Sequence, residues 1–198
     1  SMPQFEVTLH GTRGSVPAPG KGFSLYGGHT SCASVRVGDR LIVLDAGTGI
    51  IPLGQRLVED DVQSVDVFLT HAHYDHIQGL PFFAPLLSPG KKIILWYAGC
   101  DTIGGGEALV ERIFSAPFLP FGISDVPSRL EYQNLFRQGG AISLSEDITL
   151  RTIPVNHPGG CLAIRIDAFG KSFVYAPDFE HDDGPWDEAL LALSLIHI

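Results

Sequence analysis

The sequence predicts a single domain of the mixed α/β (α+β) class, and three observations support this prediction. A chain of 198 residues has the usual length of one domain. Its composition, with 44% hydrophobic and 18% charged residues, suits a protein that buries an apolar core. Strand patterns dominate the first part of the chain and then alternate with helical patterns, and neither a repeat nor a linker divides them. We therefore expect one domain over residues 2–192.

The first part of the chain has the strand-like alternation of apolar and polar residues. Residues 5–10 form the first expected strand, and a loop rich in proline and glycine follows it. Residues 33–37 and 41–44 flank a Gly-Asp pair, which is a strong signal for a β-hairpin. A Gly-Thr-Gly turn then leads into an expected helix over residues 50–58.

The rest of the chain predicts strands separated by helical segments and loops. Strands are expected at residues 65–70, 92–97, 148–155, 161–166 and 172–175. Helical structure is expected at residues 77–87, where two prolines interrupt it, and at residues 107–114. Residues 116–128 contain three prolines and predict an ordered surface loop.

Four polar residues each lie just past the end of an expected strand, and together they predict a functional site. They are Asp45, His71, His157 and Asp178. Sites are usually built on loops that a rigid sheet holds in place. We therefore expect these four side chains to converge.

Residues 71–76 read His-Ala-His-Tyr-Asp-His and directly follow a buried strand. Polar groups crowded at such a position need partners, and metal ions are the best candidates. The spacing does not fit one face of a helix, but a loop can direct two histidines one way and an Asp-His pair the other. Imidazole and carboxylate are ligands of Zn²⁺. Two ions about 3.5–4 Å apart activate water in many hydrolases, so the segment predicts a dinuclear site.

The motifs resemble those of the metallo-β-lactamase fold hydrolases, in the phosphodiesterase and tRNase Z-like branch. The matching segments occur in the expected order: Gly11-Thr12-Arg13-Gly14-Ser15, Tyr26-Gly27-Gly28-His29-Thr30-Ser31, Leu44-Asp45-Ala46-Gly47-Thr48-Gly49, His71 to His76, His157-Pro158-Gly159-Gly160 and Asp178-Phe179-Glu180-His181. The resemblance implies an αββα sandwich with a dinuclear metal site.

The resemblance also implies a role for each site residue. The implied ligands are His71, His73 and His157 for one metal, Asp75 and His76 for a second metal, and Asp178 as the bridge between them. Asp75 and Asp178 are the expected catalytic carboxylates, and a hydroxide between the metals is the expected nucleophile. The expected cofactors are two divalent ions, zinc first and manganese or iron as alternatives.

Four further residues are expected around the metals. Asp45 is expected to orient a histidine ligand through its free ring nitrogen. Thr48 and His29 are expected to line the pocket, although the family often has asparagine where this chain has His29. His181 has two possible roles: it replaces a missing metal ligand, or it is a solvated loop histidine.

The C-terminal part of the sequence departs from the family pattern. The family usually has one more histidine on the second metal, well beyond the position of Asp178. Residues 193–198 do not fit that segment and resemble a non-native tail. We therefore expect a fold that lacks its last β/α portion and a second metal site that lacks one ligand.

Charge and composition restrict the partners. A net charge of −9 disfavours broad binding to phosphates, so nucleic acid is not an expected partner. The scattered Cys32, Cys100 and Cys161 suit reduced thiols. No apolar run reaches the roughly 18 residues of a membrane span, so we expect a cytoplasmic protein without a membrane partner. A missing β/α portion exposes apolar surface and sheet edge, which predicts a homo-oligomer.

The sequence thus predicts a metal-dependent hydrolase, a phosphodiesterase that acts on a small-molecule phosphodiester. Three alternatives stay open. One is a lactonase or esterase on the same site, and another is a tRNA-processing nuclease. The third is a truncated metal-binding fragment with weak activity.

Overall fold

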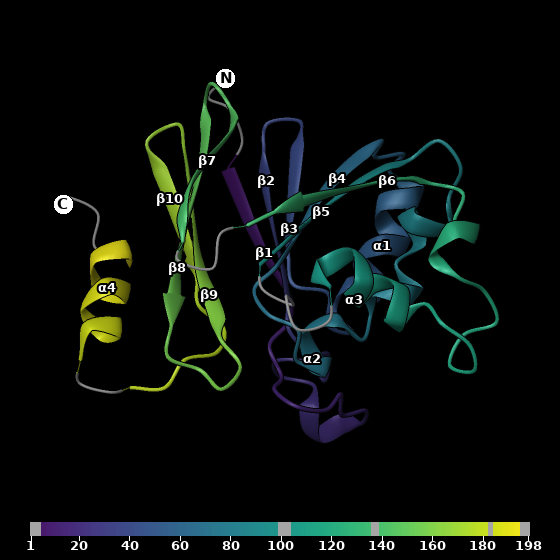
Figure 1. The fold of residues 1–198 in the computed structure, drawn as a ribbon, viewed down its shortest axis with the longest axis horizontal. Coiled ribbons are helices and arrows are strands. Elements are labelled where there is room, and N and C mark those ends of the chain that lie inside the picture. The colour runs from purple at the N-terminus through teal and green to yellow at the C-terminus, as the bar shows by residue number, and fades with distance from the viewer. Residues whose placement is uncertain (1–4, 99–103, 136–138, 182–183, 195–198) are drawn as a thin grey trace.

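Two β-sheets lie face to face in this protein, and helices cover both outer faces (Figure 1). The computed structural model describes residues 5–98, 104–135, 139–181 and 184–194, with the side chains of residues 186 and 187 left out. Helices α1 (Ile50–Glu59) and α3 (Gly105–Ile113) cover the first sheet, and α4 (Pro185–Ser194) covers the second. This arrangement confirms the expected αββα sandwich.

The first sheet has six strands, in the order β1-β2-β3-β4-β5-β6. Their bounds are β1 (Phe5–Gly11), β2 (Cys32–Val37), β3 (Arg40–Leu44), β4 (Ser64–Leu69), β5 (Lys92–Tyr97) and β6 (Arg129–Asn134). Strands β1 to β3 pair antiparallel, whereas β3 to β6 pair parallel. Because parallel strands end at the same edge, the residues after β3 and β4 emerge side by side.

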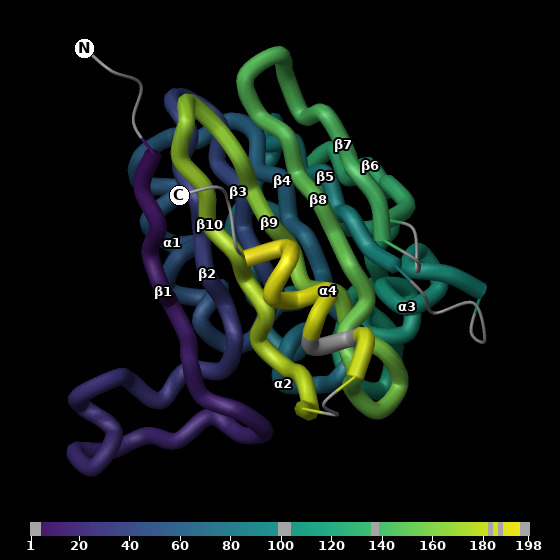
Figure 2. Tube along the Cα trace, turned by 90° about the vertical axis from the view of Figure 1, so that its left-hand side faces the viewer, coloured from purple at the N-terminus to yellow at the C-terminus, as the bar shows by residue number. Residues whose placement is uncertain are grey.

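The second sheet has four antiparallel strands, in the order β10-β9-β8-β7. Their bounds are β7 (Gly140–Ser145), β8 (Ile148–Val155), β9 (Cys161–Ala168) and β10 (Lys171–Tyr175). Helix α4 lies across the outer face of this sheet and contacts β8 and β9 (Figure 2).

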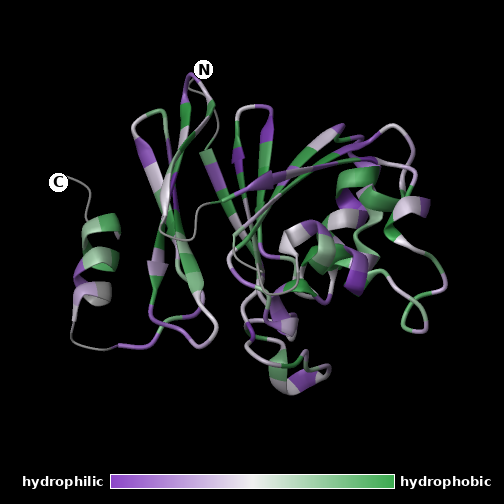
Figure 3. Ribbon diagram, in the orientation of Figure 1, coloured by the Kyte–Doolittle hydropathy of each residue, from purple (hydrophilic) through white to green (hydrophobic). Residues whose placement is uncertain are grey.

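Three apolar cores hold the four layers together. Phe68 and Ile164 are fully buried in the core between the two sheets. Leu53 of α1 packs against Val67 of β4 in the core beneath the helices of the first sheet. Leu193 of α4 packs against the second sheet. Figure 3 shows hydrophobic residues on the strands and on α1 and α4, the elements that enclose these cores. Each fully buried large apolar side chain contributes about 1.5–3 kcal/mol.

The interrupted helical structure expected at residues 77–87 is confirmed as two short 3-10 helices, η2 (Leu80–Phe82) and η3 (Ala84–Leu87). Other elements were not expected from the sequence. Strands β6 and β7 and helix α4 are additional elements. Residues 193 and 194 form the end of α4, while residues 195–198 of the suspected tail lie outside the described residues, so the tail stays a prediction.

Two of the three cysteines lie among the described residues. Cys32 and Cys161 are buried and free, and Cys100 lies outside the described residues. Within the described residues, no helix is both long and apolar enough to cross a membrane.

Candidate metal centre

The polar segment after β4 is an irregular stretch that leads into a one-turn helix. Strand β4 ends at Leu69, and the one-turn helix α2 (Tyr74–Ile77) begins just past His73. The amide N–H of His76 closes this turn on the carbonyl of His73 at 3.0 Å. Asp45, after β3, has a left-handed φ of 61°, so the chain turns sharply beside the same edge.

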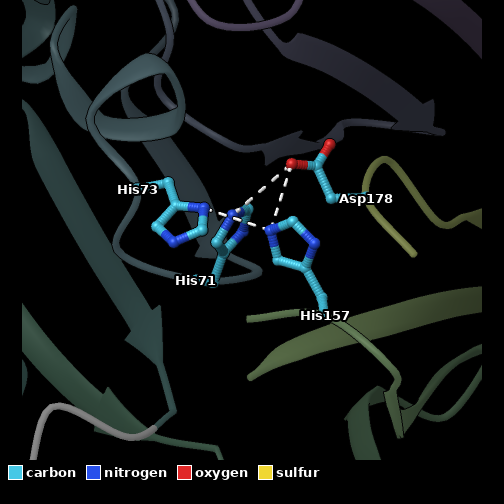
Figure 4. A group of neighbouring side chains, drawn as sticks. All are labelled: His71, His73, His157 and Asp178. Atoms are coloured by element: carbon cyan, nitrogen blue, oxygen red, sulfur yellow. Dashed lines mark hydrogen bonds and ion pairs between the residues drawn. The ribbon is translucent and has the colours of Figure 1, made fainter. Parts of the chain in front are cut away.

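Four of the expected residues form one cluster: His71, His73, His157 and Asp178 (Figure 4). One ligand atom from each lies within 4.8 Å of every other. Nε2 of His157 is 3.1 Å from Nδ1 of His73 and 3.4 Å from Oδ2 of Asp178. The loops after β4, β8 and β10 supply these side chains, so both sheets contribute to the cluster.

A second group shares Asp178 with this cluster. Nε2 of His76 lies 3.4 Å from Oδ2 of Asp178 and 3.6 Å from Oδ2 of Asp75. The same Asp178 oxygen is 3.7 Å from Nε2 of His71. One carboxylate oxygen therefore lies between two sets of donor atoms, as a bridging ligand requires.

Two buried ring nitrogens without hydrogen-bond partners show whether a metal ion fits these residues. Nε2 of His71 and Nε2 of His76 have no hydrogen-bond partner, and they are two of only three such buried side-chain atoms in the described part of the chain. An unpaired buried polar atom costs about 1–3 kcal/mol. A lone pair directed at a divalent ion removes that cost, and imidazole with carboxylate is a donor set that zinc accepts. The residues therefore fit a metal.

The two buried histidines differ in their electrostatic surroundings. Burial, followed by the neighbouring imidazoles, lowers the pKa of His71 to about 3, which keeps the ring neutral. Burial also acts to lower the pKa of His76, but the hydrogen bond and charge of Asp45 and the charges of Asp178 and Asp75 outweigh it. The pKa of His76 is therefore raised.

Asp45 is fully buried next to the two groups of ligands, where it contacts His76 and Thr70. Its Oδ2 accepts a hydrogen bond from Nδ1 of His76 at 2.7 Å. Its Oδ1 accepts a hydrogen bond from the backbone N–H of Thr70 at 2.8 Å. The Thr70 hydroxyl and the Tyr175 hydroxyl complete its surroundings, at 2.8 and 3.2 Å from Oδ2.

Sequence reasoning did not single out Thr70 or Tyr175. Thr70 lies just past the end of β4, immediately before His71, and Tyr175 ends β10, three residues before Asp178. That position, next to the expected ligands, is the signal by which they could have been found. Burial, followed by the charge of Asp45, raises the pKa of Tyr175 well above its ordinary value, so it stays a hydrogen-bond donor.

The remaining expected residues lie outside the cluster. Oγ1 of Thr48 is 3.2 Å from Nδ1 of His29 and accepts the backbone N–H of Thr30 at 2.9 Å, so it braces the 29–31 loop. His181 is exposed and packs edge-on against the ring of Phe179, with centroids 4.9 Å apart. The pocket roles of these residues stay predictions.

Comparison with known proteins decides the family. Residues 40–195 match the model of the beta-lactamase superfamily domain. The chain belongs to the beta-lactamase superfamily. It is 26% identical to ribonuclease Z of Clostridium tetani over 170 residues, which cover 84% of this chain and 51% of that protein. The chain thus spans about half the length of the curated relatives it matches.

Solved structures of this superfamily share the fold. The short form of human tRNase Z has a TM-score of 0.60 at 15% identity, over 85% of this chain and 67% of that one. Zn²⁺-bound PqqB from Methylobacterium extorquens has a TM-score of 0.55 at 18% identity, over 86% of this chain and 62% of that one. Together with the match to the superfamily domain, these structures confirm the expected metallo-β-lactamase fold.

Proposed function

We propose that this protein is a metal-dependent hydrolase of the phosphodiesterase type with a dinuclear centre. The observation that carries the proposal is the position of Asp178. Its Oδ2 lies 3.4–3.7 Å from Nε2 of His71, His76 and His157. Two of those nitrogens are buried and otherwise unpaired, so a shared pair of ions accounts for all of them.

Each metal would have its own ligands. His71, His73 and His157 would hold one ion, Asp75 and His76 would hold the other, and Asp178 would bridge them. When bound, such ions polarise the scissile group and lower the pKa of water toward ~7. Zinc suits these ligands and is present in the related PqqB structure, while manganese and iron accept the same donor types.

The protein's own groups hold the two carboxylates in place. The backbone N–H of Ser15 donates to Oδ2 of Asp75 at 2.7 Å, so the loop after β1 fixes that side chain. Glu180 donates its backbone N–H to the carbonyl of Asn156 at 2.7 Å, which ties the Asp178 loop to the His157 loop. These contacts let Asp75 and Asp178 serve as the catalytic carboxylates with little reorganisation.

A second candidate function, cleavage of RNA, follows from the segment between β1 and β2. The relatives are named ribonuclease Z, which weakens the expectation that nucleic acid is not a partner. Residues 7–38 contain no aspartate or glutamate, although the chain carries a net charge of −9. There the Arg13 guanidinium lies 4.7 Å from the Phe23 ring centroid, and Tyr26 is 82% exposed.

Arg13, Phe23 and Tyr26 help to line a cavity of about 430 Å³. Cationic and aromatic side chains together suit phosphates and bases. This local chemistry favours a nucleotide-containing substrate over a lactone.

Hydrolysis of matched substrates tests the proposal. We expect the zinc- or manganese-loaded protein to hydrolyse bis-p-nitrophenyl phosphate faster than any of a panel of lactones. Asp178→Asn should abolish this activity, whereas Asp39→Asn, the same substitution in the exposed turn between β2 and β3, should retain it. Faster turnover of a lactone would overturn the phosphodiesterase assignment.

Cleavage of a precursor tRNA separates the two candidates. If the RNA is the better substrate, the ribonuclease function holds. If it is neither bound nor cleaved while the small diester is hydrolysed, the substrate is a small molecule.

We also propose that the protein is a cytoplasmic homo-oligomer. Free buried thiols at Cys32 and Cys161 suit a reducing compartment. Exposed apolar side chains between β1 and β2, namely Val16, Leu25 and Tyr26, offer surface for self-association. Light scattering at micromolar concentration should show a mass above 21.4 kDa, and a clean monomer would contradict the proposal.

A further inference from the structure

We propose that Thr70 and Tyr175 are positioning residues that act through Asp45 to fix the ring tautomers of His71 and His76 together. The inference rests on the proposed function, in which these two histidines are ligands of different metals. In this inference the buried Asp45 carboxylate orients a histidine ligand of each metal. It contacts His76 directly and reaches His71 through the Thr70 hydroxyl.

The Asp45–His76 contact fixes the first tautomer. Oδ2 of Asp45 is 2.7 Å from Nδ1 of His76, and both side chains are fully buried. An ionised carboxylate can only accept hydrogen bonds. Nδ1 of His76 therefore carries the proton, and Nε2 presents its lone pair toward Asp75 and Asp178.

Thr70 transmits the same constraint to His71. Its Oγ1 lies 2.8 and 3.0 Å from the two Asp45 oxygens and 3.1 Å from Nδ1 of His71. The hydroxyl has a single proton, which it donates to the carboxylate because Asp45 cannot donate in return. The hydroxyl oxygen then accepts from Nδ1–H of His71. Nε2 of His71 is left with its lone pair toward Asp178, as in His76.

Tyr175, in the second sheet, also hydrogen-bonds to the Asp45 carboxylate. Tyr175 is the last residue of β10, and its hydroxyl donates to Oδ2 of Asp45 at 3.2 Å. The two residues are 130 positions apart in the sequence. Asp45 and Thr70 directly follow strands β3 and β4 of the first sheet, while Asp178 follows β10 of the second sheet. Tyr175 therefore couples the orientation of the two histidines to the position of the strand that supplies the bridging carboxylate.

Histidine tautomers can be read directly by ¹⁵N NMR of the metal-free protein. At a pH above the end of both imidazole titrations, where both rings are neutral, we expect His71 and His76 each to carry the single ring proton on Nδ1. In Thr70→Val, His71 should shift toward the Nε2–H form while His76 keeps its tautomer. Thr70→Ser keeps the hydroxyl and should restore the wild-type pattern. Thr152→Val, a buried threonine of β8, is the matched control and should change neither ring.

Zinc affinity gives the second measurement. Loss of a group that orients a ligand typically costs about 10–100-fold in metal affinity. Thr70→Val and Tyr175→Phe should each weaken at least one zinc site by that factor. Tyr132→Phe, the same change at a partly buried tyrosine of β6, is the matched control and should not.

Unchanged tautomers in Thr70→Val, or an equal effect in Thr152→Val, would overturn the inference. If Thr70→Val does not fold, a proton on Nε2 of either histidine in the wild-type protein would overturn it. If the wild-type protein shows both expected tautomers but binds no zinc, the proposed function fails while the hydrogen-bond relay stands.

Discussion

Oδ2 of Asp45 lies 2.7 Å from Nδ1 of His76, and neither side chain is exposed to solvent. Asp45 follows β3, and His76 is in the short helix after β4, so the contact joins two neighbouring parallel strands at their carboxyl ends. Such a buried pair is costly to break, because the remaining partner loses both its hydrogen bond and its contact with water.

Removal of the Asp45 carboxylate should destabilise the protein strongly. Asp45→Ala leaves the ring N–H of His76, the N–H of Thr70 and the hydroxyl of Tyr175 without an acceptor. We expect a loss of about 3–5 kcal/mol in the free energy of unfolding, measured by urea denaturation. The control is Arg129→Ala, which removes an exposed ion pair with Glu131 and should cost about 0–1 kcal/mol. Similar losses in the two variants would contradict the role of Asp45.

His10 should make the protein less stable in mild acid. Burial, followed by the charge of Arg56, lowers the pKa of His10 from 6.5 to about 4. Between those values the unfolded chain binds more protons than the folded protein. Stability is therefore fully present above pH 6.5 and falls as the pH drops toward 4.

Unfolding by urea between about pH 7.5 and about pH 5 measures this effect. In His10→Asn the free energy of unfolding should depend less steeply on pH than in the wild type. Equal slopes would show that His10 does not titrate differently on unfolding.

An added methyl group at Gly47 should disturb the Asp75 segment. A Cβ at this position would lie 2.4 Å from the carbonyl oxygen of Asp75 and 2.7 Å from that of Ser31. Gly47→Ala should cost about 1–3 kcal/mol and lower the zinc content of the purified protein. Gly14→Ala, where no atom lies within 4 Å of the added Cβ, is the matched control. Wild-type stability and zinc content in Gly47→Ala would contradict this close contact.

Chelation should lower the thermal stability of the metal-loaded protein. A ligand that binds only the folded state stabilises it by about 2.7 kcal/mol at one hundred times its Kd. Addition of EDTA should therefore lower Tm, and readdition of zinc should restore it. His71→Ala should have a lower Tm in zinc and a smaller response to EDTA. A wild-type Tm that is unchanged by EDTA would contradict metal binding by the folded protein.

The sequence predicted the site better than the periphery of the fold, for physical reasons. Asp45, His71, His157 and Asp178 each follow a strand whose apolar pattern is strong. The convergence of the last three in one cluster, with Asp45 bonded to the neighbouring His76, was therefore predictable. Strands β6 and β7 are half-buried or exposed along much of their length and have no strong apolar pattern. Their pairing depends on neighbouring strands and was missed.

The hydrogen-bond relay could not be predicted from sequence. Thr70 and Tyr175 are ordinary strand residues by pattern, and only the packing of the two sheets brings their hydroxyls to Asp45. His29 and His181, by contrast, are part of segments that resemble family motifs, but neither belongs to the cluster of His71, His73, His157 and Asp178.

Metal content per chain tests the central claim most directly. After reconstitution with zinc and removal of free metal, elemental analysis of the wild-type protein should give about two ions per chain. Asp178→Asn, which removes the shared carboxylate, should give fewer, whereas Asp39→Asn in the exposed β2–β3 turn should match the wild type. One zinc or none per wild-type chain would contradict a dinuclear centre.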